Sequence, residues 1–134
     1  MKFVSVKPEG AVMFDSELKK HNLIFVKFHV PTCPHCIAMK DTWESLNNHP
    51  RLKDKNVTLM DVDGMAVTDS KASCVRDLVG YPSIMQVSNK GEKMCEYEGD
   101  RSLEDILKFI VDKSGNSNKT NPNGSSSGMG SKTR

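Results

Sequence analysis

The pattern of apolar and polar residues predicts three β-strands in the first half of the chain. Residues 3–6 alternate between apolar and polar side chains, as expected of a short strand. Residues 23–30 are apolar apart from Lys27 and His29, and this short run, rich in β-formers, is typical of a central strand covered on both faces. Residues 57–62 have a similar composition and predict a second buried strand.

Helical periodicity predicts four helices. The segment after Pro34 places Met39, Trp43 and Leu46 on one face, and proline fits a first helical position because the N–H it lacks is unpaired there. The last helix is the clearest, since its apolar residues form one stripe and Ser102 precedes it as a capping residue would. The predicted helices cover residues 9–21, 34–49, 70–79 and 102–113.

Two further strands are predicted at residues 83–87 and 93–97, on either side of Asn89-Lys90-Gly91, which favours a hairpin turn. The predicted order is therefore β-α-β-α-β-α-β-β-α. Strands that alternate with helices, followed by a hairpin and a closing helix, predict an α/β domain. Its central mixed sheet would be covered by helices on both faces.

Composition places the folded domain within residues 1–113. A chain of 134 residues suits one domain with a single hydrophobic core. Residues 114–134 contain six Ser, four Gly and four Asn, and Met129 is their only large apolar side chain. We expect this tail to be disordered because it cannot bury enough surface to offset its conformational entropy.

The charge distribution argues against nucleic acid and membranes as partners. The net charge is +2, and residues 1–113 hold 16 of the 19 basic and all 17 acidic side chains, so the domain is nearly neutral. No segment has the roughly 20 apolar residues that span a bilayer. The N-terminus lacks the apolar core of a secretory signal. We therefore expect a cytoplasmic protein, or one of the secretory-pathway lumen if a leader has been removed.

Cys33-Pro34-His35-Cys36 is the candidate chemical centre. The two thiols follow a predicted strand and open a predicted helix, so both lie on its first turn. The partial positive charge and unpaired N–H groups of a helix N-terminus favour a thiolate. A thiolate attacks disulfides, and the second cysteine can resolve the mixed disulfide. The alternatives are a bare structural disulfide and a zinc site, for which the available ligands are Cys33, Cys36, His35 and His29.

The other two cysteines, Cys74 and Cys95, each stand alone in settings typical of buried small hydrophobic residues. A structural bridge between them is an alternative. Four cysteines in a chain of this length do not form the dense disulfide framework of a small secreted scaffold.

The order of elements, with the dithiol at the start of the second helix, resembles thioredoxin. It resembles more closely the catalytic, a-type thioredoxin domain of protein disulfide isomerase. The resemblance covers roughly residues 3–113 and implies the thioredoxin fold and thiol–disulfide chemistry. It is carried by residues 26–36, 37–40, 80–83 and 97–101 and by Trp43.

This resemblance implies the roles of the site residues. Cys33 would be the exposed nucleophile and Cys36 the more buried resolving thiol, with a cis Tyr81–Pro82 peptide bond facing them. The implied substrates are protein or peptide thiols and disulfides, and glutathione or a protein reductase or oxidase would recycle the dithiol. No dissociable cofactor is required. The implied substrate groove consists of Thr32, Gly80, Tyr81 and Pro82.

Two departures from the family pattern bear on the nucleophile. Pro34-His35 stands between the cysteines, as in strongly oxidising disulfide oxidases of bacteria, and His35 can stabilise the Cys33 thiolate. That stabilisation would make the disulfide a better oxidant. An exposed His35 without effect on Cys33 is the alternative. Thr32 replaces the family's usual tryptophan, which is expected to alter substrate selection near Cys33.

A third departure is Lys27, six residues before Cys33, where the family has a buried acid that moves the proton of the resolving cysteine. A lysine cannot stay buried and charged without a partner or a shifted pKa. Near Cys36 its charge would favour that thiolate, and a neutral lysine could itself be the base. Alternatively, its stem packs in the core and its ammonium reaches water. His29, on the same strand face, is expected to be packed and hydrogen-bonded.

Together these patterns predict a thiol–disulfide oxidoreductase of oxidase or isomerase type that uses Cys33 and Cys36 on protein substrates. One alternative is a cytosolic, thioredoxin-like disulfide reductase. The other is a thioredoxin-fold binding module that makes little use of its dithiol.

Overall fold

The computed structural model describes residues 1–6 and 10–118, and within them the predicted order of elements is confirmed. The strands are β1 (Lys2–Val6), β2 (Ile24–His29), β3 (Thr58–Asp63), β4 (Ser83–Val87) and β5 (Lys93–Glu96). The helices are α1 (Ala11–Leu18), α2 (Pro34–Glu44), α3 (Ser73–Arg76) and α4 (Leu103–Asn118). None of these helices is long and apolar enough to cross a bilayer.

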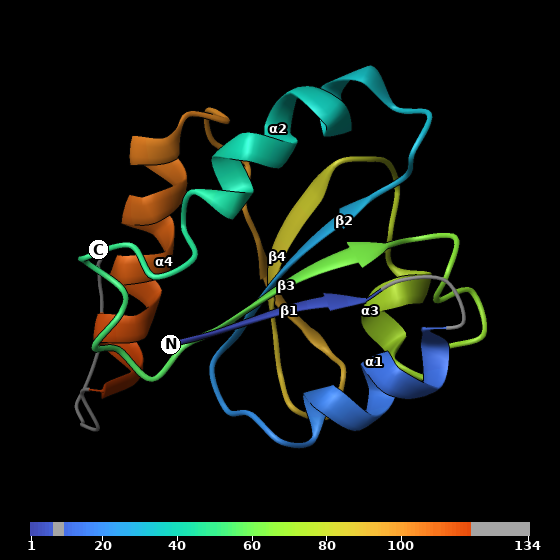
Figure 1. The fold of residues 1–134 in the computed structure, drawn as a ribbon. Coiled ribbons are helices and arrows are strands. Elements are labelled where there is room, and N and C mark those ends of the chain that lie inside the picture. The colour runs from blue at the N-terminus through green and yellow to red at the C-terminus, as the bar shows by residue number, and fades with distance from the viewer. Residues whose placement is uncertain (7–9, 119–134) are drawn as a thin grey trace.

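The five strands form one mixed sheet in the order β1-β3-β2-β4-β5 (Figure 1). The first three strands along the chain are parallel to one another, and β4 and β5 complete the sheet as an antiparallel hairpin. The apolar run predicted as a central strand is β2, which has a neighbour on each edge and is buried along almost its whole length. Its carboxyl end leads directly to the dithiol.

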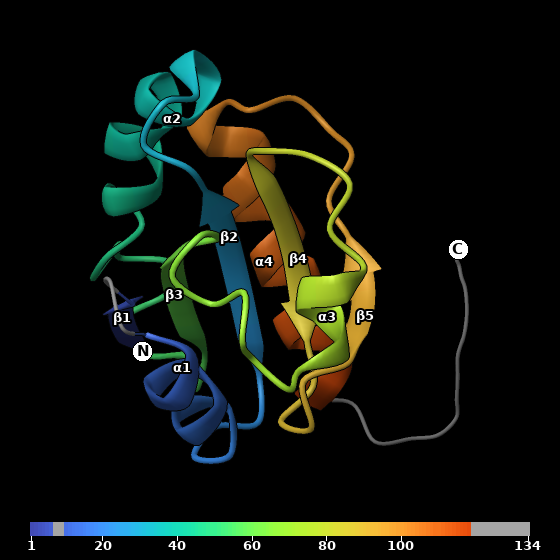
Figure 2. The same ribbon diagram turned by 90° about the vertical axis from the view of Figure 1, so that its right-hand side faces the viewer.

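Helices cover both faces of the sheet, as predicted (Figure 2). On one face Phe14 and Leu18 of α1 pack with the side chains of Val26 and Phe28. The core of the opposite face is formed with α2 and α4, and its members include Phe25, Met39, Trp43, Leu59, Ile106 and Ile110. Because side chains of a strand alternate between faces, Lys27 and His29 lie on the same face as Phe25, beneath α2.

The third helix is shorter than the predicted segment 70–79. It spans only Ser73–Arg76, because the backbone of Ala72 directly ahead of it is extended, with ψ 129°. Asp15 of α1 accepts both the Ser70 hydroxyl and the Lys71 backbone N–H.

The last helix continues beyond the predicted domain boundary at residue 113 to Asn118. Ser114 is only 1% exposed, and its hydroxyl donates to the Val111 carbonyl at 2.9 Å, so the helix includes a residue that composition assigned to the tail. The remainder of the predicted tail, residues 119–134, lies outside the described residues.

The hairpin turn depends on Gly91, which has φ +85°, a backbone conformation that favours glycine. A Cβ atom at this position would lie 2.6 Å from the Cβ of Ala72. Gly91 therefore permits both the turn and its close approach to Ala72, just before α3. The Gly91 carbonyl also accepts the N–H of Cys74, within α3, at 2.9 Å.

We predict that Gly91→Ala destabilises the domain by about 2 kcal/mol, because the backbone strain and the contact with Ala72 act together. Gly80→Ala is the matched control, since a Cβ at Gly80 meets nothing within 4 Å, and it should cost less than about 1 kcal/mol. Denaturant unfolding of both variants measures the difference. Equal losses would contradict this account of the turn.

Candidate active site

The candidate active site begins where β2 delivers the chain to α2. The Cys33 N–H donates to the Val30 carbonyl at 3.2 Å, which closes a turn into the helix. Cys33 is the N-cap of α2, and its sulfur accepts the backbone N–H of Cys36 at 3.2 Å. Pro34 follows at the start of the helix, as predicted. The Cys33 sulfur thus occupies the place where a helix usually has an oxygen acceptor.

Polar contacts lower the pKa of Cys33. The largest contribution is a hydrogen bond from the Cys36 thiol. The backbone N–H groups of Cys36 and His35 and the charge of Arg101 act in the same direction, against the opposing effect of burial. Each of these groups favours the thiolate because it places a donor or a positive charge near the sulfur. Cys33 is also partly exposed, so this sulfur can meet a substrate.

Cys36 has the opposite environment. Its side chain is 3% exposed, and burial, followed by the hydrogen bond to Cys33, raises the pKa of the thiol to about 11. The charge of Lys27 opposes this rise. At neutral pH Cys36 therefore keeps its proton while Cys33 is shifted toward the thiolate. This difference is what a nucleophile and a resolving thiol require.

The loop before β4 lies beside Cys33. The Cys33 thiol makes a long contact of 3.7 Å with the Tyr81 carbonyl, and the Tyr81–Pro82 peptide bond is cis. The Tyr81 ring packs against Gly64, where a Cβ atom would lie 2.5 Å from the phenol oxygen. The structure therefore brings Tyr81 and Pro82, with Gly80 just ahead of them, to the nucleophile.

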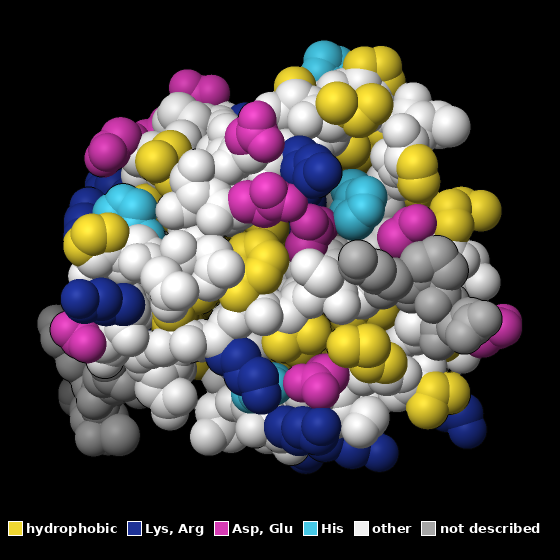
Figure 3. Space-filling view, viewed as in Figure 1, with side chains coloured by type: hydrophobic (Ala, Val, Ile, Leu, Met, Phe, Trp, Pro, Cys, Tyr) yellow, Lys and Arg dark blue, Asp and Glu magenta, His cyan; other side chains and the backbone are white. Residues whose placement is uncertain are grey.

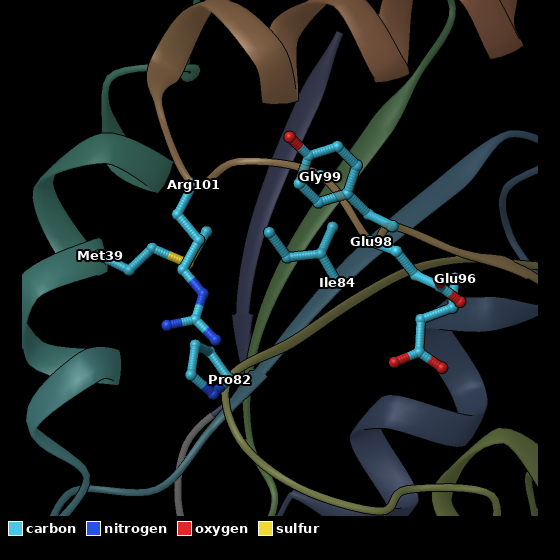
Figure 4. Close-up of a pocket in the computed structure, with 8 residues that line it drawn as sticks. Met39, Pro82, Ile84, Glu96, Glu98, Gly99 and Arg101 are labelled. Atoms are coloured by element: carbon cyan, nitrogen blue, oxygen red, sulfur yellow. The ribbon is translucent and has the colours of Figure 1, made fainter.

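A pocket of about 210 Å³ extends from Pro82 toward the start of α4 (Figure 4). Met39 and Ile84 contribute apolar walls, and the guanidinium of Arg101 extends toward Pro82. Sequence reasoning assigned no role to Arg101, because nothing marks a single arginine in a loop as part of a site. Its charge nevertheless contributes to the lowered pKa of Cys33.

Two predicted site residues, Thr32 and His35, are exposed at the surface beside the dithiol. The effect of His35 on the pKa of Cys33 comes through its backbone N–H. Stabilisation of Cys33 by the His35 imidazole stays a prediction, as does the effect of Thr32 on substrate selection. Within residues 1–6 and 10–118, no three His, Cys, Asp or Glu side chains are grouped to hold a metal ion.

Lys27 is buried and paired with an acid that sequence reasoning missed. Its side chain is 1% exposed, and its Nζ lies 3.3 Å from Oδ1 of Asp61. The alternative in which the ammonium reaches water is wrong, because β2 and β3 pair in a register that places Lys27 opposite Asp61 inside the sheet. The sequence could have predicted this pair, since a buried lysine needs a carboxylate and Asp61 is the only acid within the strand predicted at residues 57–62.

His29 completes a cluster with Lys27 and Asp61, since its Nδ1 lies 2.9 Å from the same oxygen, Oδ1, of Asp61. Burial alone would raise the pKa of Asp61, but its contact with His29 and the charge of Lys27 hold it below the ordinary value. All three residues line a cavity of about 230 Å³ together with Cys36. The buried charge in this site therefore lies next to the resolving thiol.

Cys74 and Cys95 are both free thiols, so the alternative of a structural bridge between them is wrong. Cys74 is buried in α3, and burial raises the pKa of its thiol to about 12. Cys95 lies on β5, with its sulfur 3.9 Å from the side-chain oxygen of Gln86. Both residues lie outside the dithiol site.

A five-stranded mixed sheet with a dithiol at the start of α2 and a cis-proline loop beside it defines a thioredoxin-fold domain. The sequence matches the thioredoxin family over residues 5–112, and the chain belongs to this family. It is 30% identical to protein disulfide-isomerase 5-1 of Arabidopsis thaliana over 112 residues, or 82% of this chain and 71% of that protein. The resemblance stated from the sequence is confirmed.

Other relatives are much longer than this chain. It is 28% identical to a protein disulfide-isomerase of Ricinus communis over 111 residues, or 83% of this chain but 22% of that protein. The first thioredoxin domain of mouse protein disulfide-isomerase A4 superposes with a TM-score of 0.65 at 24% identity, covering 87% of this chain and 79% of that one. This likeness shows the fold. The chain spans about a quarter of the length of the first curated relatives that it matches.

We predict that Asp61→Asn lowers the free energy of unfolding by about 3 kcal/mol, because it leaves the Lys27 ammonium buried without its counter-charge. Lys27→Met in the Asp61→Asn background should recover much of this loss, since it removes the unpaired charge. Denaturant unfolding at neutral pH measures all three proteins. An Asp61→Asn variant as stable as the unmodified chain would show that the pair is unimportant.

Proposed function

We propose that this chain is a thiol–disulfide oxidoreductase that acts on the cysteines of protein substrates. The observation that carries the proposal is the contrast within the dithiol. The pKa of the partly exposed Cys33 is lowered, and that of the buried Cys36 is raised to about 11. Membership of the thioredoxin family and similarity to protein disulfide-isomerases support it.

In the proposed cycle the Cys33 thiolate attacks a substrate disulfide and forms a mixed disulfide. Cys36 then attacks Cys33, releases the substrate thiol and leaves an oxidised Cys33–Cys36 pair. The reverse sequence transfers the disulfide to a substrate dithiol. The loop of Tyr81 and Pro82 lies beside the nucleophile, where the bound peptide would be placed. Glutathione or a protein oxidoreductase would restore the dithiol.

The direction we propose is oxidation and isomerisation. Groups that stabilise the Cys33 thiolate stabilise the reduced dithiol, and a more stable reduced form makes the disulfide a stronger oxidant. The contacts that lower the pKa of Cys33 come from the start of α2 and from Arg101. They stabilise the thiolate, and a thiolate exists only in the reduced protein. Such a couple suits an oxidising compartment such as the secretory-pathway lumen.

We predict that a Cys36→Ser variant accumulates mixed disulfides with substrate proteins through Cys33, because the resolving thiol is absent. Non-reducing electrophoresis followed by mass analysis identifies the linkage. A Cys33→Ser variant is the matched control and should accumulate none. Partners that remain bound to Cys33→Ser, without any mixed disulfide in Cys36→Ser, would instead indicate a binding module.

We predict a reduction potential of about −180 mV or less negative for the Cys33–Cys36 couple, in the range of protein disulfide isomerase or above it. Equilibration with defined glutathione ratios, followed by thiol counting by mass, measures it. A value near about −270 mV would indicate a thioredoxin-like reductase. The absence of any reversible couple would exclude the enzyme.

A further inference from the structure

Cys36 needs a base in order to resolve a mixed disulfide. Its pKa of about 11 leaves very little thiolate at neutral pH, and only the thiolate is an effective nucleophile. The proton must therefore be removed as the attack proceeds, by a group within reach of the sulfur or connected to it by water. The cavity beside Cys36 is the place to look for that group.

Four other ionisable side chains line this cavity: Lys27, His29, Lys40 and Asp61. A lysine ammonium has no lone pair, so neither lysine accepts a proton while it is charged. Asp61 is ionised, but its lowered pKa makes it a weak base toward a thiol. His29 is the remaining candidate.

The contact between His29 and Asp61 determines which ring nitrogen is free. Nδ1 of His29 lies 2.9 Å from Oδ1 of Asp61, a distance at which two acceptors would repel, so Nδ1 carries the proton. The alignment of these two buried atoms falls short of a full hydrogen bond, and neither atom has another hydrogen-bond partner in the described part of the chain. Neutral His29 therefore keeps Nε2 as its acceptor, and the carboxylate stabilises the imidazolium that forms when Nε2 takes a proton.

We propose that His29, oriented by Asp61, accepts the proton of Cys36 in the resolving step, an inference that rests on the proposed thiol–disulfide activity. Lys27 neutralises Asp61 and holds the carboxylate in place at 3.3 Å. Where the family has a single buried acid, this chain has a histidine on β2 and an aspartate on the neighbouring strand β3. Because His29 takes the reacting proton in this step, it is a catalytic residue, while Asp61 and Lys27 are positioning residues.

The proposed step balances as a two-electron exchange. Cys36 Sγ attacks Cys33 Sγ, the bond between Cys33 and the substrate sulfur breaks, and the Cys33–Cys36 disulfide forms. The substrate sulfur leaves with the electron pair and takes a proton from water, while the proton of Cys36 passes to Nε2 of His29. The dithiol is oxidised, and the substrate disulfide is reduced.

The surroundings of His29 allow the proton to arrive and to leave. His29 and Cys36 line the same cavity of about 230 Å³, which is large enough to hold water. The side chain of His29 is 26% exposed, so the imidazolium can release its proton to solvent. On the face shown in Figure 3, acidic and basic side chains lie close together in the region below α2 of Figure 1.

The charged groups that face His29 come from three elements. Lys27 on its own strand and Asp61 on β3 form the cluster described above, and Lys40 approaches from α2. Asp63 is the register partner of His29 on β3, and one of its carboxylate oxygens accepts the Met65 N–H at 2.9 Å. Two carboxylates and two lysine side chains therefore face the ring.

The test separates formation of the mixed disulfide from its resolution. Reduced chain is mixed rapidly with oxidised glutathione, quenched with acid, and analysed by mass for the Cys33–glutathione adduct and its decay. We expect His29→Asn to slow the decay about a hundredfold at neutral pH and to leave adduct formation unchanged. Asparagine keeps an N–H for Asp61 but has no second ring nitrogen.

The pH profile gives a readout that a merely structural role would not produce. In the unmodified chain the decay rate should level off as the pH rises, because transfer of the proton to His29 then replaces direct ionisation of Cys36. In His29→Asn it should keep rising about tenfold per pH unit, because it then follows the small thiolate fraction of Cys36.

His21→Asn is the matched control. His21 also contacts a carboxylate, with 3.1 Å between its Nε2 and Oε1 of Glu17, but it follows α1, which covers the other face of the sheet. This variant should leave both rates and the pH profile unchanged. His29→Gln repeats the test if His29→Asn fails to fold, and the profile of the unmodified chain decides the question without any variant.

Three results would overturn the inference while leaving the proposed function intact. These are an unchanged decay rate in His29→Asn, an equal slowing of formation and decay, and a profile of the unmodified chain without levelling. If the unmodified chain forms no adduct with oxidised glutathione or never resolves it, the proposed function fails together with the inference.

Discussion

The sulfur of Cys33 caps the first turn of α2, and the chemistry of the site depends on this contact. β2 ends at His29, and a turn closed by the hydrogen bond from the Cys33 N–H to the Val30 carbonyl connects it to the sulfur, so the central strand of the sheet determines where the sulfur lies. The backbone N–H of Cys36 donates to the sulfur at 3.2 Å, so folding of the helix itself places a donor on the nucleophile. The same turn directs Cys36 into the interior. One helix start therefore produces two thiols with opposite pKa shifts.

A second constraint comes from the charges inside the sheet. Lys27 in β2 cannot remain an ammonium unless β3 supplies a carboxylate, and the parallel register of the two strands places Asp61 opposite it. Such a pair contributes little net stability, because the desolvation of both charges offsets their attraction. The pair instead positions His29, because Asp61 also contacts the His29 ring. All three residues line the cavity beside Cys36.

Much of this structure could be predicted from the sequence, because the signals were local. Alternation and apolar runs predicted the strands, helical spacing placed Met39 and Trp43 in the core, and the glycine of Asn89-Lys90-Gly91 marked the hairpin. The dithiol could be recognised from its position between a strand and a helix. Those features depend on residues close together in the chain.

Features that depend on distant residues were not predictable in the same way. Asp15 in α1 accepts hydrogen bonds from Ser70 and Lys71, and α3 begins only at Ser73, after the extended backbone of Ala72. The partner of Lys27 follows from strand register, and Arg101 reaches the site from the loop before α4. For Lys27 the need for a partner was visible in the sequence, whereas the location of Arg101 was not.

The central claim is that the fold assigns opposite pKa shifts to Cys33 and Cys36. Ultraviolet absorbance of thiolate tests it most directly, followed across a pH titration of the reduced chain in which Cys74→Ala and Cys95→Ser remove the other two free thiols. We predict one ionisation below the value of an ordinary cysteine, about pH 8.5, which persists in Cys36→Ser and is lost in Cys33→Ser, and a second that occurs only in strongly alkaline solution. Two ionisations near the ordinary value, or a low one that survives in Cys33→Ser, would contradict the account.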